Sequence, residues 1–478
     1  MNLGMLSSEL AVIGLALVVL LLDLWTPHER KSCLGYIAAV GLLVILIVSF
    51  CIGPRHSAIG FNGMFMQDGL AIFFKRIFLA AGIFVTLMGV EFRERIPQGL
   101  GEFFSITLIA LAGMMFAASA NDFVMVFVAI EMMSVSFYVL VSFQRSRPNS
   151  LEAGVKYLIL SALSAGVLVF GIALIFGTAG GTGFTAVAAK GSQLAQNKAF
   201  WLGTLLVLLG LAFKIAAFPM QMWAPDVYQG APTPVTAFLA IGSKAAGFVL
   251  VLRVLFVAAP ALAAQWGKLF LWTAALTILY GNLCAIPQRS LKRLLGYSSI
   301  ANAGYMLLGV AALNASGAVA VLYYLAGYSV TLAAVFMVLT LVAPESDDIS
   351  VLAGLGRRSP LLALTLTLGM ISLAGLPPLA GFFGKLLLFK AILVQATENR
   401  AYLWLALVGI AGVVISIYYY FGVIRAVYWS EEGERTPVAV SAPMKISIGA
   451  CIAAMLYLGI CPEAVFSAAT EAVKALRF

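Results

Sequence analysis

The sequence contains few charged residues: only 10% of its 478 residues are Asp, Glu, Lys or Arg. Soluble domains usually contain about 25%, whereas 62% of the residues here are hydrophobic. A soluble globular fold is therefore excluded, and the composition is typical of a protein that crosses a membrane many times. The net charge of +9 does not indicate a nucleic-acid partner, because the cations are spread along the chain without a basic tract.

Cysteine and histidine are also scarce. The five cysteines include no CxxC pair and mostly lie in or beside apolar runs, which is typical of buried, unreactive thiols. The two histidines, His28 and His56, stand in expected loops, so no histidine-based metal site is expected inside the membrane. Without a GxGxxG motif or a cysteine cluster, the sequence has no signature for flavin, nicotinamide or iron–sulfur binding.

Long apolar runs dominate the chain. About 20 residues are enough to cross the ~30 Å hydrocarbon layer as a helix, and the short connections leave no room for a soluble domain. We therefore predict a single all-α, multi-pass membrane domain with a retained first span, because the start lacks the basic segment and cleavage site of a signal peptide. About fourteen spans are predicted, at residues 9–26, 34–52, 69–91, 103–119, 122–143, 152–178, 201–227, 234–259, 268–286, 294–313, 317–343, 359–396, 402–429 and 442–461.

The distribution of Lys and Arg predicts the orientation. Connections that follow odd-numbered spans carry more of these residues, among them Arg93 and Arg435, than the opposite side, to which Arg55, Lys75 and Arg76 are assigned. Short cytoplasmic loops are enriched in Lys and Arg. Both termini are therefore predicted to lie outside the cytoplasm.

Two spans, the seventh and the twelfth, are interrupted by proline. As one helix, the twelfth span (359–396) would be about 57 Å long, nearly twice the hydrocarbon thickness. Interrupted helices at matching positions in two halves are typical of transporters built from repeats, and Pro219 and Pro378 are 159 residues apart. The alternative is an accidental spacing, because proline is common in membrane helices. The prolines at or beside the interruptions are Pro219, Pro225, Pro232, Pro377 and Pro378.

Four charged residues are expected at membrane depth near these interruptions: Glu131, Lys214, Lys244 and Lys385. Such residues are costly unless they face a partner or a water-filled cavity. Burial favours the neutral form of an amine and a nearby carboxylate favours the charged form, so Glu131 and Lys214 would titrate as a coupled unit. Lysines joined by water would form a proton relay, with Glu131 and Lys214 at the input, Lys244 in the middle and Lys385 at the exit.

Structural roles are the alternative for several charged residues. Glu131 and Lys214 could form a static ion pair that joins two helices. Lys156 and Arg253 lie near the ends of their spans and could extend to the membrane surface, although Lys156 could instead belong to the relay. Lys390 could extend to the surface or join the relay.

The tenth span contains several polar residues in the run KRLLGYSSIANAGYMLLG. Hydroxyl and amide groups inside a membrane usually form hydrogen bonds between helices. A second interpretation is that they hold water for the relay. The residues are Tyr297, Ser298, Ser299 and Asn302.

The chain resembles a known family in three segments: FKIAAFPMQMWAPDVYQGAPTPVTAFLAIGSKAA, SLKRLLGYSSIANAGYMLLG and AGLPPLAGFFGKLLLF. The family is subunit N of the proton-pumping NADH:quinone oxidoreductase (respiratory complex I), the bacterial counterpart of mitochondrial NADH dehydrogenase subunit 2. The resemblance covers essentially the whole chain and implies fourteen spans with two inverted five-helix repeats and discontinuous helices seven and twelve. It also implies that the family's essential carboxylate and channel lysines are Glu131, Lys214, Lys244 and Lys385.

On this resemblance, residues 1–100 form three N-terminal spans, residues 101–260 and 261–430 form the two repeats, and residues 431–478 contain the last span. Sister subunits L and M and the cation/proton antiporters share the broken helices. Lys385 differs from the glutamate usual in subunit M, and the chain is expected to lack the long lateral helix of subunit L. Some relatives have histidine where this chain has Asn302, so only a water-holding role is expected there.

The resemblance implies a proton-translocating, non-redox subunit of complex I in the bacterial cytoplasmic membrane. NADH, FMN, iron–sulfur clusters and quinone are expected in other subunits, and no cofactor is expected in this chain. The implied partners are subunits K and M, the lateral helix of subunit L, and membrane lipid. The alternatives are a subunit of a cation/proton antiporter or membrane-bound hydrogenase, and a self-contained transporter. A solute transporter is disfavoured because the expected cavity residues are few and mostly lysines, which provide little variety for recognising a solute.

Overall fold

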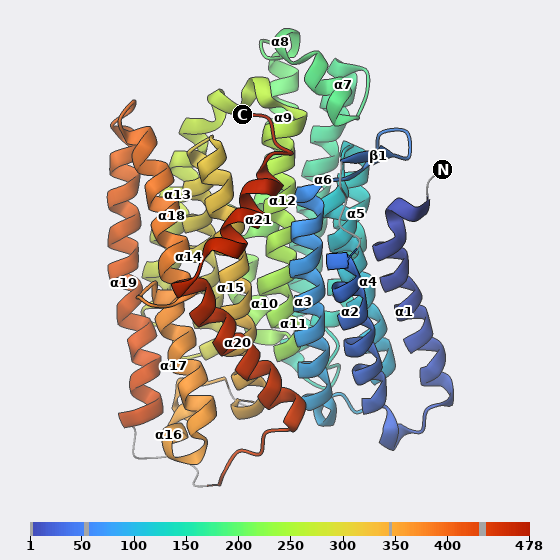
Figure 1. Ribbon diagram of the computed structural model, residues 1–478, viewed down its shortest axis with the longest axis vertical. Helices are drawn as coiled ribbons and strands as arrows, with labels where there is room; N and C mark the ends of the chain where they lie inside the picture. Colours follow the sequence, from blue (N-terminus) through green and yellow to red (C-terminus); the bar gives the residue numbers. More distant parts are fainter. Residues whose placement is uncertain (1–2, 52–56, 344–346, 430–435) are drawn as a thin grey trace.

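The computed structural model describes residues 3–51, 57–343, 347–429 and 436–478. It is a bundle of long, parallel and antiparallel helices (Figure 1). The prediction of an all-helical, multi-pass membrane protein is confirmed. Arg55, His56 and Arg435, which the sequence analysis assigned to loops, lie outside the described residues.

Thirteen helical segments of the described chain are long and apolar enough to cross a membrane. The twelfth span is broken into two shorter helices and brings the total to fourteen, as predicted. The eleven spans made of one α-helix are α1 (Ser7–Trp25), α2 (Ser32–Cys51), α3 (Gly69–Glu91), α4 (Leu100–Ser119), α5 (Phe123–Val141), α6 (Pro148–Ala179), α13 (Ala263–Ala285), α14 (Leu291–Ala311), α15 (Ala315–Val342), α19 (Ala401–Trp429) and α20 (Ala442–Ile460).

The remaining three spans are composite. The seventh consists of α9 (Lys198–Ile215) and α10 (Trp223–Gly230). The twelfth consists of α17 (Pro360–Ala374) and α18 (Ala380–Ala396). The eighth is continuous but irregular, because α11 (Thr233–Phe238) and α12 (Lys244–Arg253) are each followed by a π-helical turn, Leu239–Ser243 and Val254–Ala258.

Short elements lie mainly at the two ends of the bundle (Figure 1). The upper end carries a hairpin of antiparallel β1 (Ala58–Gly60) and β2 (Phe65–Gln67), with Ile59 opposite Met66. It also carries α7 (Phe184–Ala189) and α8 (Gly191–Leu194), which lie in the connection between the sixth and seventh spans. The lower end carries α16 (Leu355–Arg358). Helix α21 (Glu463–Val473) lies along the side of the bundle, in contact with α3 and α15. Single 3-10 turns cover Leu3–Leu6, His28–Arg30, Arg93–Arg95, Pro260–Leu262 and Ile349–Leu352.

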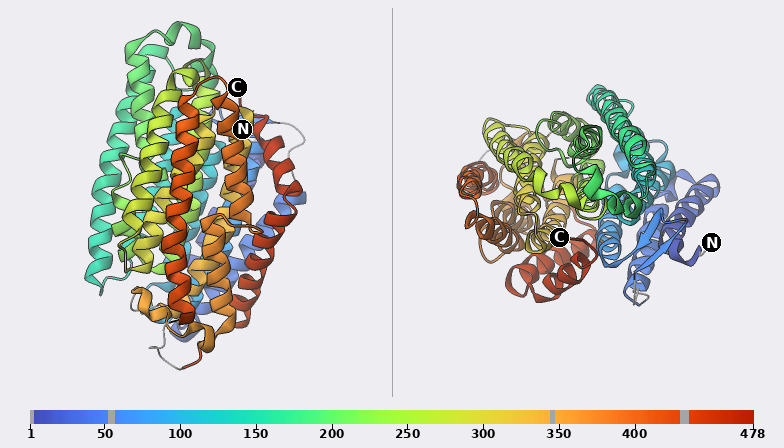
Figure 2. Two further views of the ribbon diagram at one scale, coloured as in Figure 1. Left: turned by 90° about the vertical axis from the view of Figure 1, so that its left-hand side faces the viewer. Right: turned by 90° about the horizontal axis from the view of Figure 1, so that it is seen from above.

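Burial separates central spans from peripheral ones. The eighth span is buried along its whole length, whereas α1, α2 and α19 expose large apolar side chains such as Leu17, Val40 and Val414. Seen from above, α1 and α19 lie on opposite sides of the bundle (Figure 2). A surface in contact with lipid requires exposed apolar side chains. Helices α1, α2 and α19 are therefore suited to the lipid-facing surface, and the eighth span forms the interior of the bundle.

Close packing at the centre depends on glycine. A Cβ at Gly281 of α13 would lie only 2.4 Å from the backbone nitrogen of Ala301 in α14. Small residues of this kind allow membrane helices to approach until their backbones touch. The contact fixes α14, which carries the whole of the predicted polar motif, against its neighbour.

The two broken spans have the same backbone hydrogen bonds at their breaks. Each first half-helix ends in a residue with positive φ, Ala216 (+57°) and Gly375 (+83°). The X-Pro bonds at Pro219 and Pro378 are both cis. The two first halves run in opposite directions, α9 from the upper end and α17 from the lower end (Figure 1). In each break an amide reaches the carbonyl five residues earlier, in the pairs Ala217–Ala212 (2.9 Å) and Leu376–Ile371 (3.2 Å).

The helix starts before the two breaks also match. Asp122 caps α5 and forms a backbone bridge with Gly183, beside α7 at the upper end. Ser290 caps α14 and forms the same kind of bridge with Asp348, in the connection that leads to α16 at the lower end. Equivalent contacts therefore occur at opposite ends of the bundle.

The predicted prolines do not all lie in the breaks. Pro219 and Pro378 lie between the half-helices, as does Pro377. Pro225 is in the first turn of α10, where a missing amide proton costs no helical hydrogen bond. Pro232 lies in the connection between α10 and α11.

Two buried ion pairs lie among the N-terminal helices: one joins the start of α3 to α12, and the other joins α1 to α3. Arg253 is completely buried, and its guanidinium contacts both carboxylate oxygens of Asp68 at 2.8 and 3.1 Å. Lys75 is 3% exposed and contacts Glu9 at 2.6 Å. The interpretation of Arg253 as a surface-seeking side chain was therefore wrong. Lys75 is not a span-end cation either, because α1 covers it.

Candidate functional site

Lys214 lies in the last turn of α9, directly before the break. Its side chain is 3% exposed, and Nζ donates to Ser134 Oγ of α5 (2.7 Å) and Ser161 Oγ of α6 (3.1 Å). Nζ also lies 5.6 Å from the centre of the Tyr157 ring. The unpaired carbonyls at a helix C-terminus favour a cation. Lys214 thus occupies a closed site where three spans meet.

Glu131 lies on α5, one helical turn before Ser134. Among the described residues it forms no ion pair with Lys214, although the two charges interact at longer range. Its Oε1 is buried and has no hydrogen-bond partner in the described part of the chain. The static ion pair considered above is therefore not observed. The hydroxyls of Ser134 and Ser161 accept hydrogen bonds from the lysine, and Glu131 keeps one carboxylate oxygen that accepts none from the described residues.

Lys244 begins α12, immediately after a π-helical turn, an irregularity that is frequent at functional sites. The side chain is 1% exposed, and Nζ donates to the carbonyl oxygen and to Oγ of Ser299 in α14. The same Oγ lies 3.1 Å from the hydroxyls of Tyr228 in α10 and Tyr328 in α15. Ser299 thus connects Lys244 of α12 to α14, α10 and α15.

Polar side chains continue from this serine across the second half of the bundle. The ring of Tyr328 stacks on that of Tyr324, with centroids 6.1 Å apart. The Tyr324 hydroxyl donates to Asn302 Oδ1 (2.6 Å), and Asn302 Nδ2 lies 3.4 Å from the hydroxyl of Tyr420. Ser298 Oγ is 2.5 Å from the same tyrosine hydroxyl.

The chain of polar groups then reaches the second broken span. Tyr419 lies against Tyr420, with centroids 4.4 Å apart, and its hydroxyl donates to Asn282 Oδ1 (3.0 Å). Asn282 Nδ2 lies 3.4 Å from the hydroxyl of Tyr305. The ammonium group of Lys385 lies 4.5 Å from the centre of the Tyr305 ring. Aromatic rings and amides thus connect Lys244 to Lys385 through contacts between side chains.

Lys385 belongs to α18 but reaches back across the break. Its Nζ donates to the carbonyl oxygens of Leu373 (2.8 Å) and Ala374 (3.1 Å), the last residues of α17. The side chain is 4% exposed. Like Lys214, it therefore places its charge at the C-terminal end of a half-helix, the negative end of the helix dipole.

The connection between Lys214 and Lys244 is different. Aromatic rings fill this space: Tyr157 lies 5.1 Å from Trp223, and Trp223 lies 6.2 Å from Tyr228. Trp223 Nε1 donates to a backbone carbonyl of α9 rather than to a side chain. Within the described part of the chain, no continuous series of side-chain hydrogen bonds joins these two lysines.

Comparisons with known proteins agree on the family. A family model described as "NADH:quinone oxidoreductase/Mrp antiporter, TM" matches residues 120–416. NADH-quinone oxidoreductase subunit N of Moorella thermoacetica is 38% identical, with 96% of each chain covered. The same subunit of Trichlorobacter lovleyi is 40% identical, with 99% of this chain and 97% of the relative covered.

The chain belongs to the NADH:quinone oxidoreductase subunit N family. A chain in a structure of respiratory complex I from Thermus thermophilus with bound aureothin is similar at a TM-score of 0.82 and 32% identity, covering 97% of this chain and 99% of that one. A chain of the Mrp complex from Dietzia sp. DQ12-45-1b superimposes at 0.84 but is only 23% identical, and this chain covers 52% of it. At this identity, the similarity to the Mrp chain concerns the fold alone.

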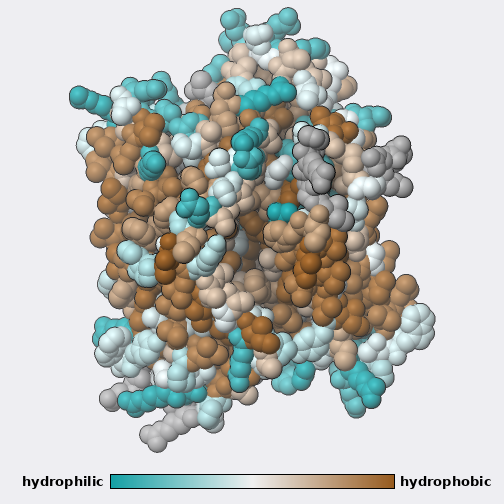
Figure 3. Space-filling model, viewed as in Figure 1, coloured by the Kyte–Doolittle hydropathy of each residue, from teal (hydrophilic) through white to brown (hydrophobic). Residues whose placement is uncertain are grey.

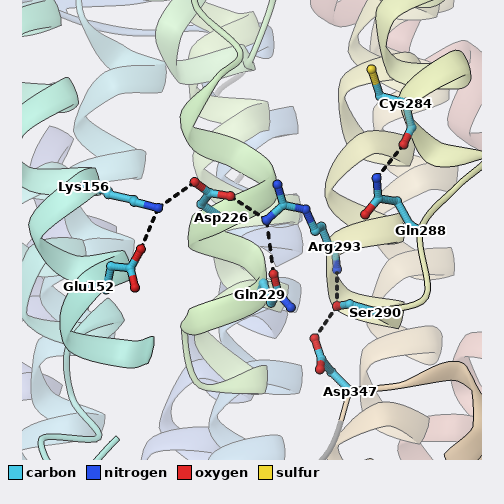
Figure 4. A network of polar contacts seen from close by, with 9 residues as sticks. All are labelled: Glu152, Lys156, Asp226, Gln229, Cys284, Gln288, Ser290, Arg293 and Asp347. Carbon is cyan, nitrogen blue, oxygen red and sulfur yellow. Dashed lines mark hydrogen bonds and ion pairs between the residues drawn. The ribbon is translucent and has the colours of Figure 1, made fainter. Parts of the chain in front are cut away.

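In this member of the subunit N family, Lys156 lies outside the row of buried lysines. Its side chain is 43% exposed and forms ion pairs with Glu152 (2.7 Å) and Asp226 (2.9 Å). Arg293 Nη1 contacts the same aspartate (2.6 Å) and Gln229 (3.2 Å). Figure 4 shows how these residues join α6, α10 and α14. The network anchors the second half of the broken span, and Lys156 makes no contact with Lys214.

Two further predicted residues are separate from the row of lysines. Lys390 is exposed on α18, about one and a half turns beyond Lys385. The ring of Tyr297 faces Arg293 at 5.9 Å and makes no contact with the buried lysines. Ser298, Ser299 and Asn302 are buried and in contact with the row, as described above.

Sequence reasoning missed most of the aromatic and hydroxyl partners. Tyr228, Tyr324, Tyr328 and Tyr420 were not singled out, although a tyrosine hydroxyl inside a membrane needs a partner. That requirement was the available signal, strongest in the run of three tyrosines that ends at Tyr420. The described residues contain no group of three or more His, Cys, Asp or Glu placed to hold a metal ion.

Proposed function

We propose that the chain is the proton-translocating subunit N of a bacterial complex I, and that Glu131, Lys214, Lys244 and Lys385 are the groups that hold protons. The observation that supports this most strongly is the row of three buried lysines. Among the described residues, each contacts neutral oxygens and aromatic rings, and none has a carboxylate in hydrogen-bonding contact. A lysine without a bound anion can become neutral without leaving a carboxylate unpaired in the interior.

Transfer between Lys244 and Lys385 uses the side chains that connect them. Serine and tyrosine hydroxyls both donate and accept hydrogen bonds, so a hydroxyl can take a proton on one side and release one on the other. Ser299 and Tyr328 begin this series at Lys244, and Tyr305 ends it at Lys385. At other points the partners cannot pass a proton directly, because the Tyr324 and Tyr328 rings only stack, Asn302 and Asn282 are amides, and Lys385 meets the face of the Tyr305 ring. Small rotations or water complete the series there.

Glu131 controls the first lysine. The carboxylate favours the protonated form of Lys214, and a movement of α5 relative to the break would change that influence. The step from Lys214 to Lys244 must pass Tyr157, Trp223 and Tyr228, so it requires rearrangement of the rings or transient entry of water. This step is the natural place for control by redox chemistry in other subunits.

The matching breaks support two inverted repeats, residues 101–260 and 261–430, between the N-terminal spans (1–100) and the last segment (431–478). The hydrogen bonds at Ala217 and Leu376 correspond, and the two first half-helices run in opposite directions. Each repeat contributes one lysine at the end of a half-helix, Lys214 and Lys385. Inverted repeats of this kind place binding groups near the membrane midplane.

The proposed setting is the bacterial cytoplasmic membrane, with both termini on the periplasmic side. Both ends of the chain lie at the upper end of the bundle (Figure 1), and Arg145, Arg147 and Arg357 lie at the other, which suits a cytoplasmic lower end. Subunits K and M and the lateral helix of subunit L are the proposed neighbours. NADH, FMN, iron–sulfur clusters and quinone would be held by other subunits.

The test replaces single lysines in the assembled complex. In inverted membrane vesicles, NADH oxidation and the resulting acidification are measured together. Lys214→Ala and Lys385→Ala are expected to lower both at least tenfold, whereas Lys390→Ala, an exposed lysine of the same α18 helix, is the matched control and should have no effect. Normal acidification in Lys214→Ala would overturn the proposed relay.

Glu131 provides a second test. Glu131→Asp should retain more activity than Glu131→Gln, because the charge acts on Lys214 at a distance and needs no specific contact. The reverse order would indicate a packing role. Acidification driven by a sodium gradient without NADH oxidation would instead favour the antiporter subunit.

A further inference from the structure

A groove outside the row of lysines opens on one face of the bundle. It lies between α2, α3, α15, α20 and α21 and has a volume of about 390 Å³. Figure 3 shows this face hollowed near its centre, between α3 and the ridge formed by α20 and α21. The walls are almost entirely apolar, with Phe73 and Phe84 from α3, Val330 from α15 and Val465 from α21.

One cation, Arg76, lines this apolar groove. It lies seven residues into α3, about 10 Å from the upper end of the helix. The guanidinium lies 4.0 Å from the centre of the Phe50 ring, and Nη2 donates to the backbone carbonyl of Ser49 (2.8 Å). In the described residues, Nε is buried without a hydrogen-bond acceptor, and no carboxylate contacts the side chain.

This arginine contrasts with the buried cations nearby. Arg253 and Lys75, which also lie near the upper end, are each paired with a carboxylate of the protein. Arg76 lies against the ring of Phe50 but contacts no carboxylate in the part of the chain that the structure describes. Because arginine stays charged in proteins and binds phosphate through several donors, an anionic group from outside the chain would complete the site.

The size of the groove favours a lipid chain over a protein helix. A helix with its side chains is about 10 Å wide and rises about 5.4 Å per turn, so a single turn occupies roughly 400 Å³. The groove would thus hold about one turn of a helix. A flexible hydrocarbon chain is much narrower and can follow an apolar groove along its length.

We propose that this groove binds one anionic phospholipid, with an acyl chain between α3, α15 and α21 and the phosphate on Arg76. The apolar walls match the chain, and the arginine supplies the opposite charge. A zwitterionic lipid carries its own cation beside the phosphate and is expected to bind less well. The site is independent of the proton relay, because it shares none of the buried lysines.

The experiment uses the full-length protein in the membrane assembly in which it is expressed, placed in phosphatidylcholine nanodiscs. A small fraction of phosphatidylglycerol with a photoreactive acyl chain is added, and cross-linked peptides are mapped by mass spectrometry. Cross-links are expected on α3 and α21, and unlabelled phosphatidylglycerol should compete with the probe, whereas phosphatidylcholine should not.

Two variants make the result specific. Arg76→Gln should lower the yield in the groove at least fivefold, whereas Arg400→Gln, an exposed arginine in the α18–α19 connection, should leave it unchanged. Equal labelling by a phosphatidylcholine probe would overturn the headgroup assignment. The absence of labelling in the groove of the intact assembly would show that a partner subunit covers it, and would overturn the proposal altogether.

Discussion

The protein contains two kinds of buried cation, and they lie in different regions. In the region of the N-terminal helices, Arg253 and Lys75 are each in direct contact with a carboxylate, of Asp68 and Glu9 respectively. Across the centre of the bundle, Lys214, Lys244 and Lys385 contact hydroxyl and carbonyl oxygens instead. Burial is similar in both regions, at 4% exposure or less, so burial alone does not distinguish them.

The difference in partners has a physical consequence. Removing the proton from an amine paired with a carboxylate leaves an uncompensated buried charge, which costs several kcal/mol. An amine that contacts only neutral oxygens leaves no such charge behind, because a carbonyl still accepts a hydrogen bond from the neutral amine and a serine hydroxyl can also donate to it. The paired cations are thus suited to hold helices together, and the lysines of the central row are suited to exchange protons.

The largest effect is expected from Lys244→Arg. Arginine does not lose its proton in proteins, and its larger head does not fit beside Ser299 in a fully buried site. NADH-driven acidification of vesicles should fall more than tenfold, while the assembled complex remains detectable. Lys390→Arg, on an exposed lysine, is the control. Unimpaired pumping by the Lys244 variant would mean that the charge of this residue matters but its proton does not.

An intermediate effect is expected from Asn302→Leu, which removes the amide between Tyr324 and Tyr420. Pumping should fall roughly three- to tenfold, equivalent to about 0.7–1.4 kcal/mol of barrier, because the lysines at both ends remain. Tyr297→Phe changes the same helix but not the connection, and should be neutral. If both variants pump equally well, protons travel between Lys244 and Lys385 by water alone.

A small effect is expected from Ser161→Ala. Lys214 then keeps its shorter hydrogen bond to Ser134 (2.7 Å), so turnover should fall about two- to threefold, at the low end of the ~0.5–1.5 kcal/mol net value of one hydrogen bond. Acidification is measured in vesicles that carry Ser161→Ala, Ser134→Ala or both changes. The comparison shows whether one hydroxyl alone can support Lys214. A double variant no worse than either single change would show that the hydroxyls do not support Lys214.

The sequence allowed the spans and the principal lysines to be predicted for a clear reason. Long apolar runs have few alternatives to membrane helices, and lysines beside prolines in such runs are rare enough to attract attention. Position along a helix, however, says little about the direction in which a side chain points. Arg253 lies near the end of its span and was expected to reach the surface, but it turns inward to Asp68, a residue 185 positions away in sequence.

The partners of the lysines were harder to predict, because they come from many helices. Lys244 meets a serine of α14, which in turn meets tyrosines of α10 and α15. No spacing rule within one helix reveals such a convergence, which depends on the packing of whole spans. Glu131 illustrates the same limit: a direct ion pair with Lys214 was one of the two interpretations, but Ser134, one turn further along α5, makes the contact.

The smallest effect on turnover is expected at the paired cations, where stability should change instead. Arg253→Met leaves Asp68 buried without its partner and should destabilise the fold by about 3–5 kcal/mol, seen as less assembled complex and a lower thermal midpoint. Turnover per assembled complex should stay at the wild-type level.

The double variant Arg253→Met/Asp68→Asn tests this explanation. It removes both charges, and asparagine can still accept the capping hydrogen bond from Ala71 N that Asp68 accepts in the native protein. Much of the lost stability should return, because no buried charge remains unpaired. If instead the assembled Arg253→Met complex fails to pump and the double variant does not restore pumping, Arg253 belongs to the proton path. The distinction between paired structural cations and proton-exchanging lysines would then be wrong.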